Sequence, residues 1–268
     1  MVQAKKALGQ HFLTDRNYCR KIVEFAAVEA DDFVVEIGPG TGQLTESLLE
    51  ANARVLAIEF DSDMVAILRA RFPDAGAGRL EIVSADILAF DWTSLPGDRP
   101  DTKLVGNLPY NIATRILTLS AAAKERFESF TFMVQKEVAQ RVIAVPGSKA
   151  YGYFSVLMDY HFQRIKGFNV PPGAFHPPPK VMSHVMQLRP VTPTFQIPDY
   201  DRFERLVAAA FAHRRNTIWN NLLGVAAPEK LTEALGGAGI DPKTRPDRLT
   251  LEQFACLARL LYNSSINA

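Results

Sequence analysis

The pattern of apolar and polar positions predicts alternating strands and helices through the first half of the chain. Residues 33–37 are a short β-branched apolar run that ends at Gly38, and residues 43–51 then place leucines at helical spacing. Further strands are predicted at 54–58, 80–83, 103–105 and 130–134, and further helices at 62–71, at about 113–122 and through Val142. Repeated strand–helix units of this kind predict a parallel sheet covered by helices on both faces.

The second half of the chain is less regular and becomes helical towards its end. An apolar segment at 153–162 and a proline-rich loop at 171–179 precede an alternating segment at 181–188. The alternation fits a late antiparallel strand. Helical patterns follow at 203–212, 217–223, 228–235 and 251–262.

Length and a proline-rich stretch predict two domains. A chain of 268 residues, 47% of them hydrophobic, has room for one large domain or for a medium domain and a small one. Three prolines between residues 190 and 198 mark a linker. We therefore expect a doubly wound, mostly parallel α/β domain over residues 1–192 and a small helical domain over residues 199–268.

Charge and cysteine content narrow the function classes. Thirty Lys and Arg against 29 Asp and Glu give a net charge of +1, so any nucleic-acid surface must come from local clusters. Cys19 and Cys256 lie far apart, which disfavours a disulfide framework or a thiolate metal site and favours a reducing compartment. Apolar runs fall short of the ~18 residues of a membrane span. We expect a cytoplasmic protein with no metal and no membrane partner.

A glycine-rich turn follows the first predicted strand. Gly38, Gly40 and Gly42 allow the backbone to bend sharply and to lie directly against a ligand, next to the free N–H groups of a helix start. The dinucleotide fingerprint has its third glycine one position later, where this chain has Gln43. The spacing therefore departs from the form that binds NAD.

Two acidic residues stand at the next strand ends. Glu59 ends the second strand, at about the distance downstream where an acid accepts the two hydroxyls of a ribose. Asp86 follows the third strand, where a carboxylate can accept the exocyclic amine of an adenine. Ligands of doubly wound sheets bind outside the carboxyl ends of the strands. These positions suit a nucleoside cofactor without a pyrophosphate, and S-adenosylmethionine is the candidate.

The fourth strand runs into Asn107-Leu108-Pro109-Tyr110, which carries the candidate chemistry. The exocyclic amine of adenine is a poor nucleophile, because its lone pair is delocalised into the ring. Two acceptors of its N–H bonds, the Asn107 side-chain oxygen and the Pro109 carbonyl, would favour a pyramidal nitrogen and aim the lone pair. The Tyr110 ring, rather than its hydroxyl, is expected to stack on a base taken out of its helix. Positioning then supplies most of the effect.

With these motifs in order, the chain resembles the rRNA adenine N6-dimethyltransferases, and most closely their bacterial small-subunit members. The resemblance implies a seven-stranded, Rossmann-like class I methyltransferase sheet and S-adenosylmethionine as cofactor. It also implies transfer of two methyl groups to each of two adjacent adenosines near the 3′ end of small-subunit rRNA. The partner would be that rRNA within an assembling ribosomal subunit, and the chain would act as a monomer.

The resemblance also implies roles for residues outside the strand ends. Residues 6–13 look like the family's segment that closes over the methionine end of the cofactor, and residues 175–181 look like its proline-rich loop, with Phe175 as a second stacking ring. Residues 211–217 look like the start of its basic C-terminal segment. The residues expected to bind the cofactor are Gln10, His11, Leu13, Gly38, Gly40, Glu59, Asp86 and Asn107.

Clusters of basic residues interleaved with aromatic ones predict an RNA surface. Phosphate contacts from such clusters position a duplex, while aromatic rings receive the extruded base. The candidate RNA-binding residues are Lys136, Arg141, Lys149, Arg214 and Arg215.

Three other functions remain open. DNA adenine methyltransferases use a related tetrapeptide with a second proline, but Leu108 stands at that position here and no separate base-reading domain is recognisable. An RNA-binding assembly factor with dispensable methylation would not need an intact tetrapeptide. A large-subunit rRNA enzyme that confers antibiotic resistance is the nearest alternative, and the proline-rich loop with Arg214 and Arg215 favours the small subunit over it.

Overall fold

The structure is a computed structural model that describes residues 10–73, 78–92, 95, 101–193, 195, 197 and 199–262. The start of the expected closing segment, residues 6–9, and parts of the predicted linker lie outside these residues. The chain forms two compact units, Met1–Ala139 with Phe162–Pro190, and Gln140–His161 with Val191–Ala268. Residues 140–161 therefore group with the C-terminal helices, whereas the sequence pattern assigned them to the first domain.

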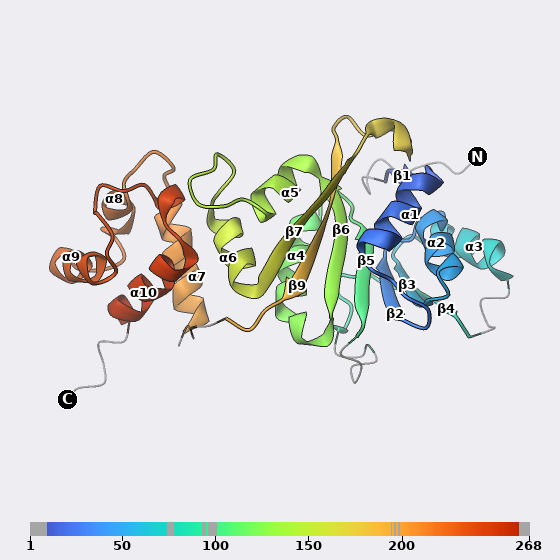
Figure 1. Cartoon of the computed structure of the whole chain (residues 1–268), viewed down its shortest axis with the longest axis horizontal. Helices are drawn as coiled ribbons and strands as arrows, with labels where there is room; N and C mark the ends of the chain where they lie inside the picture. The colour runs from blue at the N-terminus through green and yellow to red at the C-terminus, as the bar shows by residue number, and fades with distance from the viewer. Residues whose placement is uncertain are drawn as a thin grey trace. The chain divides into compact units, whose positions relative to one another are not determined.

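The first unit is built on a seven-stranded sheet in the order β4-β3-β2-β5-β6-β9-β7 (Figure 1). All pairs are parallel except those of β9, which runs antiparallel to β6 and β7. The predicted doubly wound, mostly parallel fold is confirmed. The strands are β2 (Phe33–Ile37), β3 (Arg54–Glu59), β4 (Leu80–Ser84), β5 (Lys103–Asn107), β6 (Ser129–Gln135), β7 (Phe162–Val170) and β9 (Ser183–Pro190).

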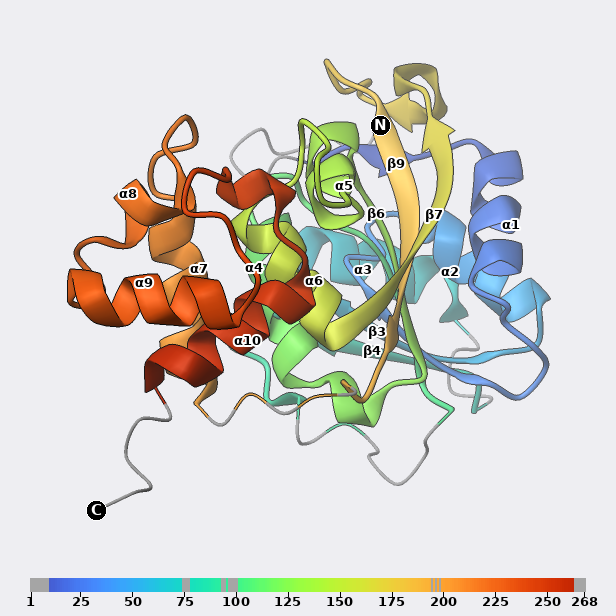
Figure 2. The same ribbon diagram turned by 60° about the vertical axis from the view of Figure 1, so that its left-hand side comes forward.

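Helices cover both faces of this sheet. Figures 1 and 2 show α1, α2 and α3 on one side and α4 on the other. Aspartates cap two of these helices: the Asp15 side chain accepts the Asn17 N–H at α1, and Asp61 accepts the Asp63 N–H at α3. The helices are α1 (Arg16–Phe25), α2 (Gln43–Glu50), α3 (Ser62–Arg71), α4 (Ala113–Ala122) and α5 (Lys136–Val142), with 3-10 turns at Lys124–Arg126 and Pro172–Ala174.

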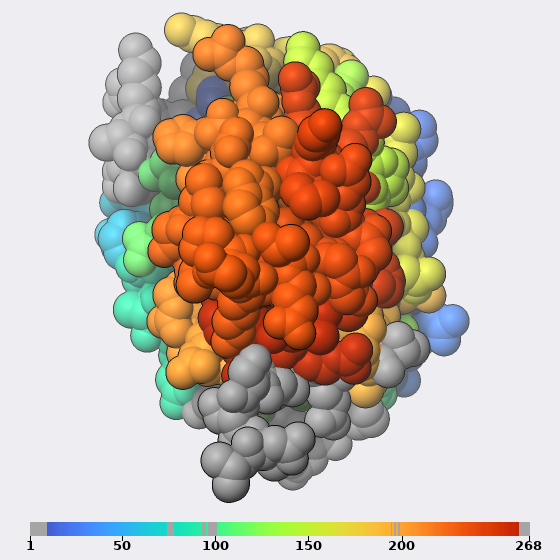
Figure 3. Space-filling model, turned by 90° about the vertical axis from the view of Figure 1, so that its left-hand side faces the viewer, coloured from blue at the N-terminus to red at the C-terminus, as the bar shows by residue number. Residues whose placement is uncertain are grey.

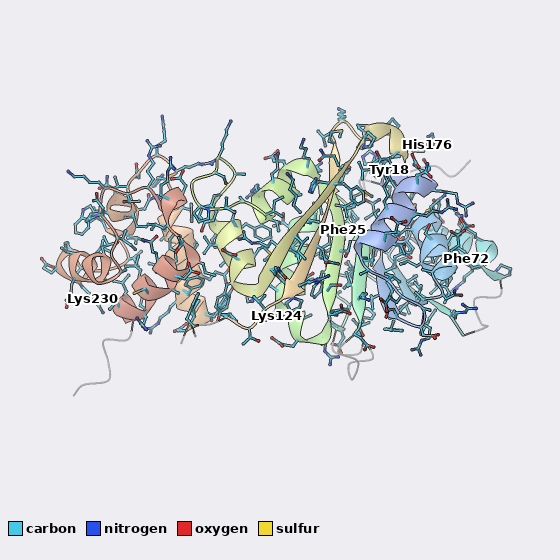
Figure 4. All side chains as sticks on the ribbon, in the orientation of Figure 1. Tyr18, Phe25, Phe72, Lys124, His176 and Lys230 are labelled. Atoms are coloured by element: carbon cyan, nitrogen blue, oxygen red, sulfur yellow. The ribbon has the colours of Figure 1, made fainter. Side chains whose placement is uncertain are left out.

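Three strands were not predicted from the sequence. β7 is an edge strand that carries two charged residues, Arg164 and Lys166, and an irregularity between Lys166 and Asn169, so its apolar alternation is weak. β1 (Phe12–Leu13) and β8 (Phe175–His176) form a separate two-stranded antiparallel sheet. His176, labelled in Figure 4, pairs with Phe12 in that sheet. Two-residue strands leave no periodicity to detect.

The second unit is helical, as predicted. Its core includes Phe203 and Leu206 of α7 and Phe254 and Leu257 of α10, all fully buried. In the space-filling view, α8, α9 and α10 form one continuous face (Figure 3). The helices are α6 (Tyr153–His161), α7 (Tyr200–Ala210), α8 (Ile218–Leu222), α9 (Pro228–Gly237) and α10 (Leu251–Tyr262), with a 3-10 turn at Pro246–Arg248. Among the described helices, none combines the length and the apolar character needed to cross a membrane.

Candidate active site

The carboxyl ends of β2, β3, β4 and β5 surround a cavity in the first unit. It measures about 1020 Å³ including its open mouth. The parallel direction of these strands places their C-terminal residues at one edge. Ten residues expected to bind cofactor or substrate line this cavity: Gln10, His11, Gly38, Gly40, Glu59, Asp86, Asn107, Leu108, Pro109 and Tyr110.

The glycine turn leaves bare main chain on one side of the cavity. Gly38, Gly40 and Gly42 have φ angles of +65°, +56° and +85°, a region that favours glycine. A Cβ on Gly40 would lie 2.8 Å from the Phe12 ring, and one on Gly42 would lie 2.8 Å from the Phe72 ring, which Figure 4 labels just after α3. The turn therefore requires glycine for its backbone angles and for close packing.

Glu59 ties the glycine turn to the end of β3. Its carboxylate is 7% exposed and accepts the Gly40 N–H at 3.0 Å and the Asp61 N–H at 2.8 Å. Burial raises the pKa of Glu59, while the backbone N–H bonds from Asp61 and Gly40 oppose that rise. Because each carboxylate oxygen has two lone pairs, acceptor capacity remains for a ligand. Just after the end of the neighbouring strand β4, exposed Asp86 uses Oδ1 to accept the Leu88 N–H at 2.9 Å.

The segment around His11 is fastened to the site by side-chain bonds. Gln10 Nε2 donates to Asp61 at 2.9 Å. His11 Nδ1 lies 2.9 Å from the Pro177 carbonyl, which can only accept, so Nδ1 carries the proton. Asn107 Nδ2 donates to the His11 carbonyl at 3.0 Å. A carbonyl cannot donate, so this bond fixes the Asn107 amide and leaves Oδ1 as its acceptor end.

The tetrapeptide corrects one sequence-based expectation. The Pro109 carbonyl accepts the Ile112 N–H at 3.1 Å and the Ala113 N–H at 3.0 Å, at the start of α4. Both of its lone pairs are used, so it is not a free acceptor for a substrate amine. Leu108 lines the cavity, and its carbonyl accepts no hydrogen bond from any described residue. The Leu108 carbonyl is therefore the backbone oxygen beside Asn107 that keeps acceptor capacity.

Tyr110 lines the cavity, and both its hydroxyl and its ring have neighbours. Its hydroxyl is 2.7 Å from Ser183 Oγ at the start of β9. Its ring centroid lies 5.5 Å from that of His11, at an interplanar angle of 33°. Burial raises the pKa of Tyr110, and the bond to Ser183 partly opposes the rise. The hydroxyl is therefore neutral at physiological pH, and the ring is available as an apolar surface.

Comparison with known proteins identifies the family to which this site belongs. The family model described as ribosomal RNA adenine dimethylase matches residues 1–262. The chain belongs to this family. It is 42% identical to Ribosomal RNA small subunit methyltransferase A of Geobacter metallireducens, over 97% of this chain and 96% of that protein. The protein of the same name in Geobacter sulfurreducens is 40% identical, over 96% of this chain and 95% of that protein.

Solved structures agree with the family. A dimethyladenosine transferase from Plasmodium falciparum is 25% identical, with a TM-score of 0.79 over 92% of this chain and 96% of that one. The 23S rRNA methyltransferase ErmE is 29% identical, with a TM-score of 0.71 over 93% of this chain and 99% of that one. The protein is an S-adenosylmethionine-dependent rRNA adenine methyltransferase.

The cavity of this family member fits S-adenosylmethionine. The glycine turn offers main chain without side chains, and Glu59 and Asp86 offer carboxylates from two neighbouring strand ends. Phe60 and Ile87 add apolar lining beside them. Sequence patterns did not single out these two apolar residues, although each directly follows a predicted acidic position. A large apolar side chain next to a strand-end acid is the signal that could have revealed them.

Two residues predicted for the site do not line this cavity. Phe175 is 4% exposed, belongs to the hydrophobic core of the first unit and does not line the cavity, so it presents no stacking ring in this structure. Its backbone pairs with Leu13, which is also buried in that core. Leu13 lines a second cavity of about 320 Å³, shared with Glu36, Gly38 and Asn107.

The candidate RNA-binding residues fall in both units. Lys136 begins α5 in the first unit, and its N–H donates to the Met182 carbonyl at 3.0 Å. Arg141, Lys149, Arg214 and Arg215 are exposed in the second unit. The structure joins two of them, because the Arg214 guanidinium donates to the Lys149 carbonyl.

We predict that Glu59→Ala weakens S-adenosylmethionine binding by about 1.5 to 3 kcal/mol, the range for hydrogen bonds to a charged group. The substitution would remove the expected ribose acceptor, and it releases the Gly40 N–H. Titration calorimetry measures the effect, with Glu81→Ala, an exposed acid on β4, as the matched control. An unchanged dissociation constant would show that Glu59 does not contribute to cofactor binding.

A second buried acid, Glu36, generates a prediction about pH. The residue is 1% exposed, and burial raises the pKa of Glu36 to about 8. The hydrogen bond that Glu36 accepts from the Thr45 hydroxyl, at 2.6 Å, partly opposes this rise. Between its ordinary pKa of 4.5 and about 8, the unfolded chain has released a proton that the folded chain keeps. The free energy of unfolding therefore falls as pH rises through this window.

We predict that Glu36→Gln removes this pH-dependent loss, because a neutral amide can still accept the Thr45 hydroxyl. Relative to wild type, the variant should gain about 1 kcal/mol or more between pH 5 and pH 9. Urea unfolding at both pH values measures the difference. Glu24→Gln, at an exposed position of α1, should show no such gain. Equal gains in the two variants would contradict the assignment.

Proposed function

We propose that this enzyme transfers two methyl groups to N6 of each of two adjacent adenosines near the 3′ end of small-subunit rRNA. Its substrate would be an assembling small subunit in the cytoplasm, on which it acts as a monomer. Relatives of 38 to 42% identity carry the name Ribosomal RNA small subunit methyltransferase A, which supports the small subunit over the 23S rRNA target of ErmE at 29%.

The observation that carries the proposal is the fixed amide of Asn107. Its Nδ2 is held by the His11 carbonyl, so Oδ1 is the end that can accept an N–H from a substrate amine. The Leu108 carbonyl supplies the second acceptor. Together these two oxygens can hold both N–H bonds of an adenine N6 amine, which favours a pyramidal nitrogen with a directed lone pair.

The remaining residues orient the two reactants. Bound S-adenosylmethionine supplies an electrophilic methyl group on its sulfonium. Glu59 and Asp86 would hold the nucleoside part, and the Tyr110 ring would stack on a base taken out of the RNA. Positioning of this kind accounts for most of the rate effect without a strong base, because alkylation itself makes the amine acidic.

The basic residues would hold the RNA. Arg214 and Arg215 lie between α7 and α8, and the carbonyl of Lys149 accepts a bond from Arg214. Such groups contact phosphates and set the position of a duplex without reading its sequence. We infer that the second unit contributes affinity and the first unit contributes chemistry.

Cells that lack this chain provide the direct test. Primer extension across their small-subunit rRNA should read through the two adenosines, since an unmodified N6 does not block base pairing. Complementation with wild type should restore the two stops, and complementation with Asn107→Ala should not. Stops that persist without the chain, or that appear in large-subunit rRNA instead, would overturn the proposed substrate.

We predict that Asn107→Ala lowers turnover by at least ~10²-fold, the scale for loss of one positioned catalytic hydrogen-bond partner. Affinity for RNA should be unchanged, because the loss concerns the amine and not the phosphates. Methyl transfer to purified small-subunit particles measures the rate. Asn17→Ala, at an exposed position of α1, is the control and should turn over like wild type. Equal rates in the two variants would contradict the role of Asn107.

We predict that charge reversal of Arg214 and Arg215 to Glu weakens binding to small-subunit particles. Each lost phosphate contact should reduce the slope of log affinity against log salt by ~0.7 to 0.9. Turnover at saturating particles should be nearly unchanged. Lys230→Glu, on α9 of the same unit and labelled in Figure 4, is the control. If affinity for the particles were unchanged and turnover were abolished, the two arginines would act in catalysis or in the stability of the core instead of in RNA binding.

A further inference from the structure

We propose that Ser183 is a positioning residue whose hydroxyl fixes the angle at which the Tyr110 ring meets a base in the cavity. Ser183 lines neither cavity, so it can influence a substrate only through a side chain that does. The inference rests on the proposed function, because it assumes that Tyr110 contacts the target base.

The contact itself is short and enclosed. The two hydroxyl oxygens are 2.7 Å apart, and Ser183 is 0% exposed. No other side-chain hydrogen bond of Ser183 occurs among the described residues. If either hydroxyl is removed, the other loses this partner. Because water reaches the position poorly, loss of the bond is energetically costly.

Ser183 is well placed to act as a fixed reference point. It pairs with Gln135 of β6 on one side and with Val170 of β7 on the other. Its backbone is therefore held by strands on both sides, at the edge of the sheet where Asn107 also ends its strand. A side chain on such an element holds its position more precisely than one on a loop.

Tyr110, by contrast, belongs to a turn between β5 and α4 and needs an external restraint. The His11 ring covers part of it at a centroid distance of 5.5 Å, but a tilted ring contact permits sliding and rotation. A hydrogen bond at the far end of the ring fixes the direction of the side chain. The ring then provides the stacking surface, and the hydroxyl determines its orientation.

The orientation matters because the acceptors for the amine are rigid. Asn107 Oδ1 is fixed through the His11 carbonyl, and a base stacked at the wrong angle would present its N6 amine away from that oxygen. Small displacements of reacting groups cost large factors in rate. Ser183 should therefore affect the rate of methyl transfer and leave cofactor affinity alone.

A double-mutant cycle tests the inference. Ser183→Ala and Tyr110→Phe are each expected to lower single-turnover methyl transfer about 3- to 10-fold at saturating particles, the range for one hydrogen bond. The double variant should be no slower than either single variant, because both substitutions remove the same bond. The dissociation constant for S-adenosylmethionine should stay within about twofold of wild type throughout.

Two further variants separate positioning from a general effect on the fold. Ser183→Thr keeps the hydroxyl on a strand that tolerates a β-branched residue, and it should restore most of the rate. Ser120→Ala removes another fully buried serine, which bonds only within α4 to the Ile116 carbonyl, and its rate should equal that of wild type. Thermal unfolding of every variant checks that each is folded.

The outcomes distinguish this inference from the proposed function. Wild-type rates for Ser183→Ala, or losses that multiply in the double variant, would overturn the role of Ser183 while methyl transfer by wild type still stood. Failure of wild type itself to methylate small-subunit adenosines would overturn the proposed function instead. A loss confined to KM, with the single-turnover rate unchanged, would also count against Ser183 as a positioning residue.

Discussion

The bond from the Asn107 amide to the His11 carbonyl is the constraint on which the site depends. It joins the end of β5 to a segment almost a hundred residues earlier in the chain, and it decides which end of the amide can accept a substrate N–H. That segment is fastened in turn by Gln10 to Asp61 and by His11 to the Pro177 carbonyl. The orientation of the Asn107 amide therefore depends on the position of this segment.

Two buried carboxylates lie at the edge of the sheet that forms the site. Glu36 and Glu59 both lie in an environment that raises their pKa, and the charge of Glu59 adds to the effect on Glu36. Backbone N–H groups offset part of this at Glu59, but those groups come from the glycine turn and the start of α3. Two acids are thus buried at this edge in the folded chain, where their charged forms are disfavoured.

The sequence predicts the fold well wherever periodicity is strong. The predicted helices at 62–71, 113–122 and 251–262 match α3, α4 and α10, and the alternating segment at 181–188 falls within or next to β9. The strand-end acids and the tetrapeptide could be placed at one edge because parallel strands bring their C-terminal ends together. The buried position of Phe175 could not be predicted. The direction of its side chain is set by the pairing of β1 with β8, and strands of two residues leave no periodicity in the sequence.

The choice of backbone acceptor shows what local sequence leaves undetermined. Proline at position 109 has no N–H, which made its carbonyl a plausible acceptor, but the availability of a carbonyl depends on where the next helix begins. The N–H groups of Ile112 and Ala113 occupy the Pro109 carbonyl as α4 begins, and this leaves the Leu108 carbonyl free of described partners. Meanwhile the Leu108 N–H is bonded to the Met133 carbonyl at 3.0 Å, so its peptide is held by the neighbouring strand. The start of α4 thus determines which carbonyl keeps acceptor capacity, and β6 holds the Leu108 peptide in position.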